Sequence, residues 1–317
     1  TYGMLNRSGY YNHTVTNIAS QFGLDLDMDF LTDGLNLSGV FAYQTNSVGS
    51  LGTTQDFERW LRTDDFNELE FVKKGSEQNT PLAYGKGHQY YYHLSYNTAL
   101  NYQRQFGLNK VSGMAYMFYQ NLTKADNSSP GLLPYNRISS GIEGNYAFDD
   151  RYLLKLVVGY SGSEQYARAV RFTTTPAVAG AWVVSNEAFT SSATWLSNLK
   201  LRASYGKTAN DQTGIARYAY LDNVTASRGG LIPYLQYIVN ENQVGNPNIR
   251  AEISTKTNVG IDLGLFNALS LSVDIFDERM DNMIVSALAT IPAYQGVPLD
   301  NYPQINGGQF ENKGFEI

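Results

Sequence analysis

The chain has 317 residues, a formal charge of −6 and no cysteine. The missing cysteine excludes a disulfide framework and thiolate-based metal or redox chemistry, and an acidic chain without a basic stripe argues against a nucleic-acid partner. No run of about 18 apolar residues is present, which excludes a membrane-spanning helix. Charged residues make up only 16% and aromatic residues reach 13%, a balance that fits a transmembrane β-barrel and a secreted all-β protein about equally well.

Alternating apolar and polar side chains predict an all-β chain, because successive residues of a strand point to opposite faces of a sheet. The alternation disappears between Thr45 and about Gly87, in a polar stretch that contains Trp60, and again over 207–250 and 286–309. Such stretches are too long for ordinary connections in a compact domain. The predicted strands are 22–30, 35–43, 90–103, 111–119, 138–148, 152–160, 168–185, 199–205, 253–265, 269–285 and 310–317.

The connections between these strands fall into two lengths. Short turns lie near Asp33, Gly107, Asp150 and Asn267, and longer, more irregular segments mostly lie between them. Membrane barrels have short turns on one side and long loops on the other, whereas soluble sandwiches join strands by crossovers and have no reason to sort loop lengths. The sorting favours part of a large antiparallel transmembrane β-barrel, with short periplasmic turns and long extracellular loops, over a soluble β fold.

Aromatic residues stand beside the short turns, where the interfacial girdle of a membrane barrel would place them. The aromatics in these positions are Phe30, Phe106, Phe148, Tyr152 and Phe266. Residues 1–317 are therefore expected to form a single domain, a partial barrel.

The hairpin from Ile253 to Val285 separates its two faces most clearly, with apolar residues on one parity of each arm. A cation on the lipid face costs about 2–4 kcal/mol near the midplane, so charged residues on the other parity are expected to face a wet lumen. The residues in this class are Asp25, Asp27, Asp29, Glu143, Lys155, Lys256, Asp262 and Asp274. Asp277, Arg279 and Asp281 instead share the apolar parity, which predicts that this strand has risen past the membrane there.

Motifs for catalysis, metal binding or cofactor binding are weak in this chain. Asp25, Asp27 and Asp29 resemble the start of a calcium loop, but Phe30 stands where the loop needs Gly and Asn36 where it needs Glu. The three carboxylates are better explained as lumen-facing side chains of a strand. Nucleophile-elbow and phosphate-loop patterns are also missing. We therefore predict no catalytic site, no metal and no cofactor, and do not expect an enzyme.

Aromatic residues in the long loops are the candidate binding residues. Aromatic faces stack on sugar rings and on apolar peptide side chains, so they suit the capture of a ligand from solution. The alternative is that these rings pack the loops against one another. The candidates are Trp60, Tyr84, Tyr234, Tyr237 and Tyr294.

Several passages resemble the SusC/RagA family of TonB-dependent outer-membrane transporters of Bacteroidetes. The most specific is Gly245–Glu252 with Thr257–Asp262, which is similar to the Asn-Pro-(Asp/Asn)-Leu-(Lys/Arg)-x-Glu and Thr-Asn-x-Gly-x-Asp passage of that family. Further similar passages, in the family's order, are Tyr146–Leu154, Pro176–Phe189, Leu199–Asp211 and Asn306–Glu316. Ala209 replaces a family Gly, and 159–163 is a weak version of Arg-x-Asp-Gly-Ser-Ser. The resemblance covers the C-terminal half; the N-terminal half matches in pattern alone.

The resemblance implies import of oligosaccharides or peptides across the outer membrane, with a SusD-like surface lipoprotein above the long loops. It also implies TonB as the source of force, acting through an N-terminal segment and plug that are not among these residues. Transporters of this class have roughly 22 strands, so we expect an internal piece of a longer chain. The alternative is a secreted β-rich adhesin or carbohydrate-binding module, which would be soluble without detergent.

Overall fold

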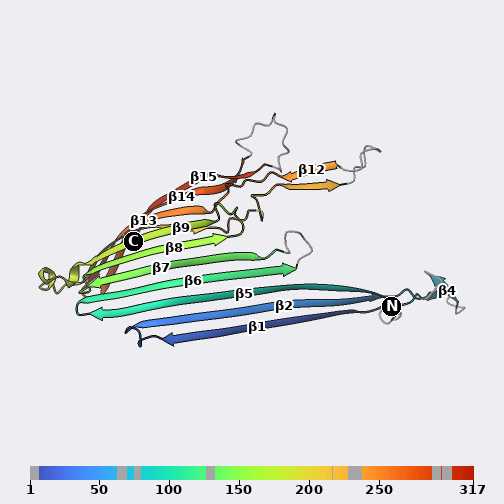
Figure 1. Ribbon diagram of the computed structural model, residues 1–317, viewed down its shortest axis with the longest axis horizontal. Coiled ribbons are helices and arrows are strands. Elements are labelled where there is room, and N and C mark those ends of the chain that lie inside the picture. Colours follow the sequence, from blue (N-terminus) through green and yellow to red (C-terminus); the bar gives the residue numbers. More distant parts are fainter. Residues whose placement is uncertain are drawn as a thin grey trace. The chain divides into compact units, whose positions relative to one another are not determined.

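The fold is all-β and antiparallel, as predicted. The computed structural model describes residues 7–62, 70–74, 80–125, 133–215, 217–227, 238–287, 294 and 302–317. Eleven strands form one sheet, in the order β1-β2-β5-β6-β7-β8-β9-β10-β13-β14-β15 (Figure 1). Their bounds are Tyr11–Asp27 (β1), Leu35–Thr54 (β2), Ala83–Phe106 (β5), Asn109–Ala125 (β6), Tyr135–Phe148 (β7), Tyr152–Ser163 (β8), Phe172–Val183 (β9), Leu196–Asn210 (β10), Glu252–Leu265 (β13), Leu269–Ser286 (β14) and Gln304–Glu316 (β15).

Each strand of the large sheet pairs with the strand before it in the chain, apart from two short hairpins inserted in the connections. One is β3 (Arg59–Arg62) with β4 (Phe71–Lys74), and the other is β11 (Asn223–Ser227) with β12 (Ile238–Gln243). The order begins with β1 and ends with β15, so the sheet is not closed on itself within the described residues. Among these residues, none of the helical segments is both long and apolar enough to cross a membrane.

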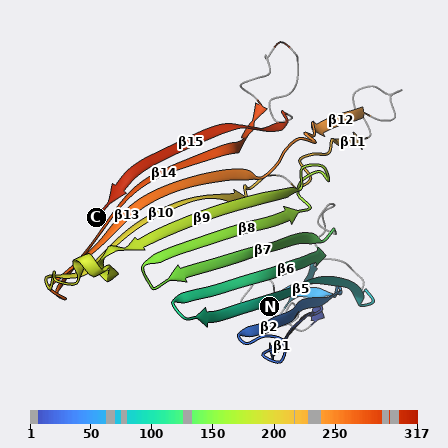
Figure 2. The ribbon, with the colours of Figure 1, turned by 60° about the vertical axis from the view of Figure 1, so that its left-hand side comes forward.

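The chain divides into two compact units. Unit 1 comprises Thr1–Gln21, Ala42–Leu94 and Leu122–Pro134, and unit 2 comprises Phe22–Phe41, Ser95–Asn121 and Tyr135–Ile317. Unit 2 holds every short turn, and in both ribbon views its strands β7 to β10 and β13 to β15 lie side by side (Figures 1 and 2). We call the edge of unit 2 that carries the short turns the turn end, and the opposite ends of the strands the loop end.

Two of the short turns have the backbone that tight hairpins require. Asp149 and Asp150 have φ angles of 49° and 50°, and Phe266 and Asn267 have 55° and 53°. Two successive residues with positive φ make a type I′ turn, whose twist matches that of the flanking strands, and Asp and Asn tolerate this conformation best. Phe266 is the exception in residue type, since a bulky side chain is strained there.

Several strands are longer than their alternation predicted. The expected loop from Thr45 to Gly87 was wrong at both ends, because β2 continues to Thr54 and β5 already begins at Ala83. The expected loops 207–250 and 286–309 likewise contain strand residues. The physical reason is that alternation records a difference between two faces. A strand with polar surroundings on both faces pairs through its backbone without showing that pattern.

Large apolar side chains are exposed along one face of the strands of unit 2. Ile142 is 67% exposed and Ile275 is 65% exposed, and both lie in the middle of their strands. Exposed patches of this extent are rare on soluble monomers and mark a surface that meets lipid or a partner. We call this the apolar face, and the opposite one the polar face.

Candidate functional site

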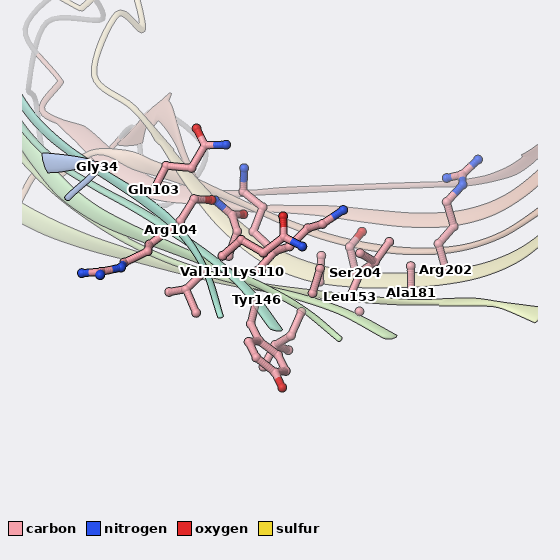
Figure 3. Close-up of a pocket in the computed structure, with 18 of the residues that line it drawn as sticks. Gly34, Gln103, Arg104, Lys110, Val111, Tyr146, Leu153, Ala181, Arg202 and Ser204 are labelled. Carbon is pink, nitrogen blue, oxygen red and sulfur yellow. The ribbon is translucent and has the colours of Figure 1, made fainter. Parts of the chain in front are cut away.

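The polar face of unit 2 forms a hollow of about 1240 Å³ near the turn end. Its lining includes Asp27, Gln103, Lys110, Lys155, Lys200 and Arg202. Figure 3 shows Gln103 and Arg202 projecting to one side of the strands and Tyr146 to the other, as the alternation of strand side chains requires. The hollow is therefore a charged surface, rich in cations, with the apolar face behind it.

Arg202 on β10 is the centre of the densest polar network on this face. Its guanidinium donates to both carboxylate oxygens of Asp274, at 2.6 and 2.5 Å, and its Nε donates to Asp262 at 3.2 Å. Ser272 accepts from Arg202 at 3.2 Å and donates to Asp262 at 2.7 Å. A planar guanidinium that meets one carboxylate with two nitrogens forms a strong and directional pair. The network ties β10 to β13 and β14.

Gly260 makes room for this network. It lies opposite Arg202 in the β10–β13 register. A Cβ added at Gly260 would stand 2.6 Å from the Arg202 guanidinium carbon and 2.7 Å from an Asp274 carboxylate oxygen. A side chain at this position would therefore displace the Arg202 guanidinium or the Asp274 carboxylate from their present contact.

Other charged residues predicted to face the lumen are paired on the polar face as well. Lys155 lies 2.8 Å from Glu143, and Lys256 lies 3.0 Å from Glu278. Lys200 differs, because among the described residues no carboxylate lies within ion-pair distance of its ammonium. It is thus a cation that lines the hollow and lies across from Asp262 in the β10–β13 register without a direct ion pair.

Asp25, Asp27 and Asp29 do not act as one set. Asp29 lies in the turn after β1, not on the strand as predicted, and its carboxylate accepts from the backbone N–H of Gly34 at 2.6 Å. Asp27 in turn accepts from the backbone N–H of Asp29 at 2.9 Å. Short acidic side chains favour turns because they can satisfy nearby backbone donors in this way. Within the described part of the chain, no group of three or more acidic or histidine side chains could hold a metal ion.

The connection between β9 and β10, at the turn end, has regular structure of its own. It contains two short 3₁₀ helices, η1 (Val184–Asn186) and η2 (Ala188–Thr190). The carboxylate of Glu187 between them accepts from the Tyr152 hydroxyl at 2.7 Å, from the Trp182 indole N–H at 3.0 Å and from Arg151 at 3.2 Å. These donors, above all Tyr152 and then Trp182, hold the pKa of Glu187 below its usual value.

A small buried core holds the loop end of unit 2 together. Tyr166 and Ile249, which are 1% and 0% exposed, pack with Ala219 and Ala251. Burial raises the pKa of Tyr166 to about 12, and its hydroxyl has no hydrogen-bond partner among the described residues. These residues come from the β8–β9 and β10–β13 connections, so two long loops share one core.

The aromatic candidates from the sequence are divided between the two units and the part of the chain that is not described. Trp60 lies on β3, 55% exposed, with the Lys73 ammonium 5.8 Å from its ring centre. Tyr84 lies on β5, 72% exposed, and Tyr294 is 87% exposed. Tyr234 and Tyr237 lie outside the described residues.

Sequence reasoning missed the roles of Arg202 and Glu187. The signal for Arg202 was present, because it falls on the polar parity of 199–205 between apolar residues. Its two carboxylate partners come from other strands, and only the register identifies them. The role of Glu187 could not be found by alternation, since it lies in a connection between strands.

Comparison with known proteins gives a consistent result. The family model for the β-barrel of TonB-dependent receptor-like proteins matches residues 1–317. A TonB-dependent receptor of Formosa agariphila is 29% identical over 174 residues, which are 55% of this chain and 17% of that protein. The TonB-dependent receptor SusC of Bacteroides thetaiotaomicron is 26% identical over 253 residues, which are 72% of this chain and 25% of SusC. The chain thus spans a quarter or less of the length of these relatives.

Among solved structures, the RagAB peptide transporter matches with a TM-score of 0.66 at 18% identity. The match covers 99% of this chain and 35% of the other. The RagAB peptide importer in its closed-closed state matches with a TM-score of 0.65. At 18% sequence identity, these matches show that the fold is shared.

Proposed function

The chain belongs to the TonB-dependent receptor-like β-barrel family, and from that premise we propose that it forms part of the wall of an outer-membrane importer. The substrates are oligosaccharides or peptides, taken up together with a SusD-like surface lipoprotein. Similarity to SusC and to the RagAB peptide transporter supports this proposal. No covalent step is required of these residues, which contribute wall, lumen lining and capture loops.

The observation that carries the proposal is the separation of the two faces of unit 2. One face exposes apolar residues such as Ile142 and Ile275, and the other holds charged residues in ion pairs around a hollow. A sheet with lipid on one side and a wet lumen on the other needs this division. A secreted adhesin would have no use for the exposed apolar face.

In the complete transporter we expect TonB to act through an N-terminal segment, and the hollow on the polar face to be covered by a plug. Lys200 is suited to meet such a plug or a passing ligand, because it lines the hollow and forms no ion pair within 4.0 Å among the described residues. Trp60, Tyr84, Tyr234, Tyr237 and Tyr294 remain the proposed substrate-binding residues. Trp60 is the described candidate that lies on the β3–β4 hairpin, in the connection between β2 and β5.

The test is uptake in the source bacterium. Deletion of the gene should abolish energised uptake of one class of labelled substrate, from a panel of oligosaccharides and peptides, and a protonophore should do the same in wild-type cells. The protein should fractionate with the outer membrane and need detergent for extraction. A chain that is soluble without detergent, or uptake unaffected by deletion, would contradict the proposal.

A second measurement tests the aromatic residues. Trp60→Ala should weaken binding of the imported ligand, because stacking on an exposed indole is lost. Lys73→Gln is the matched control for the cation beside the ring. Unchanged affinity in Trp60→Ala would show that this ring serves loop packing.

A further inference from the structure

Unit 1 has a groove of about 390 Å³ that crosses β1, β2 and β5 near the loop end of these strands. Asn12 and Thr14 of β1 form one wall, Lys86 and His88 of β5 form the other, and Gly49 of β2 lies between them. Each wall is a pair of residues two positions apart, which share a face of their strand. A Cβ added at Gly49 would meet nothing within 4 Å, so the missing side chain leaves the groove open.

The chemistry of the groove is that of an anion site. The two walls supply an ammonium, an imidazole, an amide and a hydroxyl, and the lining contains no carboxylate. Among the described residues, no acidic group lies within ion-pair distance of Lys86 or His88. The Lys86 ammonium lies 5.7 Å from the Tyr84 ring centre, and the His88 and Tyr90 rings lie 5.8 Å apart. Both basic side chains are thus flanked by aromatic rings that limit their freedom.

The groove opens on the face that meets lipid, not on the face that lines the lumen. Lys86 and His88 have the same parity on β5 as Tyr90 and Tyr92. That parity carries the apolar residues of the strand, so a substrate moving along the polar face would not contact the groove.

The position of the groove relative to the membrane–water interface indicates which kind of anion it meets. The Tyr92 ring stacks on that of Tyr43 at 6.5 Å, and paired tyrosines on a lipid-facing surface mark the membrane–water interface. His88 and Lys86 precede Tyr92 by four and six residues, on the side of β5 away from the short turn. At 3.3 Å per residue and a tilt near 45°, they lie roughly 9–14 Å beyond that interface. This is the level of lipid headgroups.

We propose that this groove binds the phosphate-bearing headgroup of a glycolipid in the outer leaflet. Lys86 supplies the point charge that suits a phosphate, and His88 donates an N–H in either protonation state. The Asn12 amide and the Thr14 hydroxyl complete the donors from the opposite wall. The proposal rests on the membrane placement argued under the proposed function and assigns the groove a ligand that is not transported.

The experiment uses the full-length transporter, purified in detergent, and native mass spectrometry to count bound lipid. The probes are lipid A, the same lipid A after enzymatic dephosphorylation, and inorganic phosphate as a competitor. Lys86→Gln with His88→Gln removes the charge and basic donors, and Gly49→Leu fills the groove while leaving both basic residues in place. Lys313→Gln is the matched control, because Lys313 is a lysine on the apolar face that is already paired with Asp277 and Glu311.

Wild type and Lys313→Gln should retain phosphorylated lipid A equally. The double variant and Gly49→Leu should each retain at least about fivefold less phosphorylated lipid A than wild type. Wild type should retain dephosphorylated lipid A as weakly as these variants retain the phosphorylated form. Gly49→Leu keeps the test valid if the double variant fails to fold, because nothing occupies the space that its side chain enters.

Equal retention by all variants, or by both forms of the lipid, would overturn the proposal. Full displacement by millimolar inorganic phosphate would also overturn it, since the groove would then be a site for free anions. Outer-membrane fractionation and substrate uptake of Gly49→Leu should stay normal. Loss of lipid binding without loss of these readouts separates this proposal from the transport function.

Discussion

The hydroxyl of Tyr152 donates a 2.7 Å hydrogen bond to the carboxylate of Glu187, joining the start of β8 to the connection between β9 and β10. Asn186 adds a second link by donating to the backbone carbonyl of Asp150 at 3.0 Å. Two neighbouring connections are thereby held together at the turn end. Tyr152 therefore has two roles: its ring lies on the apolar face, and its hydroxyl holds the connection between β9 and β10 through Glu187.

Loss of this link should loosen the connection and leave the sheet intact. Glu187→Ala removes the acceptor shared by Tyr152, Trp182 and Arg151, so we expect faster amide hydrogen exchange over 184–195. The strand amides of β8 should be unchanged because their ladder does not depend on Glu187. Asn186→Ala, which leaves the carboxylate in place, is the control and should have a smaller effect. Unchanged exchange in Glu187→Ala would show that the backbone alone holds the connection.

The same link should depend on pH. The pKa of Glu187 is lowered in the folded protein, chiefly by the Tyr152 hydrogen bond. A group with a depressed folded pKa contributes stability above its unfolded pKa, and that contribution is lost as the pH falls through the folded value. Protection of 184–195 should therefore be complete at neutral pH and fall below about pH 4. In Tyr152→Phe the loss should begin at a higher pH, and an unmoved midpoint would contradict this assignment.

Arg202 should matter for the stability of the lumen wall. Arg202→Gln leaves Asp262 and Asp274 without the guanidinium that binds both, and the lost hydrogen bonds are charge-assisted, which makes them stronger than neutral ones. We expect the Arg202→Gln variant to lose its heat-modifiable migration on gels at a lower urea concentration than wild type. Lys200→Gln, which removes the cation opposite Asp262 but no hydrogen bond to a carboxylate, should lower the urea midpoint less.

A double-mutant cycle isolates the pair itself. The effects of Arg202→Gln and Asp274→Asn on the free energy of unfolding should be less than additive, because either substitution alone already breaks the same bidentate contact. Strict additivity would mean that the two side chains stabilise the wall independently.

Gly260 offers a steric test of the same network. Gly260→Ala places a methyl group 2.6 Å from the Arg202 guanidinium carbon, so either the guanidinium moves off Asp274 or the strands separate locally. The urea midpoint should fall. Gly144→Ala is the matched control, since an added Cβ there meets nothing within 4 Å. If both substitutions behave alike, the close approach at Gly260 has no energetic weight.

Alternation in the sequence was sufficient to predict the parts of the strands that have different surroundings on their two faces. The turn at Asp149 and Asp150 and the apolar arm of β13 follow from local chemistry, because Asp tolerates positive φ and alternate residues share a face. The extensions of β2 and β5 could not be predicted, since their two faces do not differ in polarity. The Arg202 network depends on strand register, and the shared core of Tyr166 and Ile249 depends on two loops folding together. Neither is encoded in a local pattern.

The loop-end core should open in alkaline solution. Burial raises the pKa of Tyr166 to about 12, above the usual value near 10. The contribution of a group with a raised folded pKa is complete below the unfolded value and is lost as the pH rises through the folded one. Limited proteolysis of the β10–β13 connection should therefore accelerate between about pH 10 and 12. Tyr166→Phe should remove this sensitivity with little change in the core at neutral pH, because the ring that packs with Ile249 is kept. If Tyr166→Phe opens at the same pH as wild type, another group controls the alkaline transition.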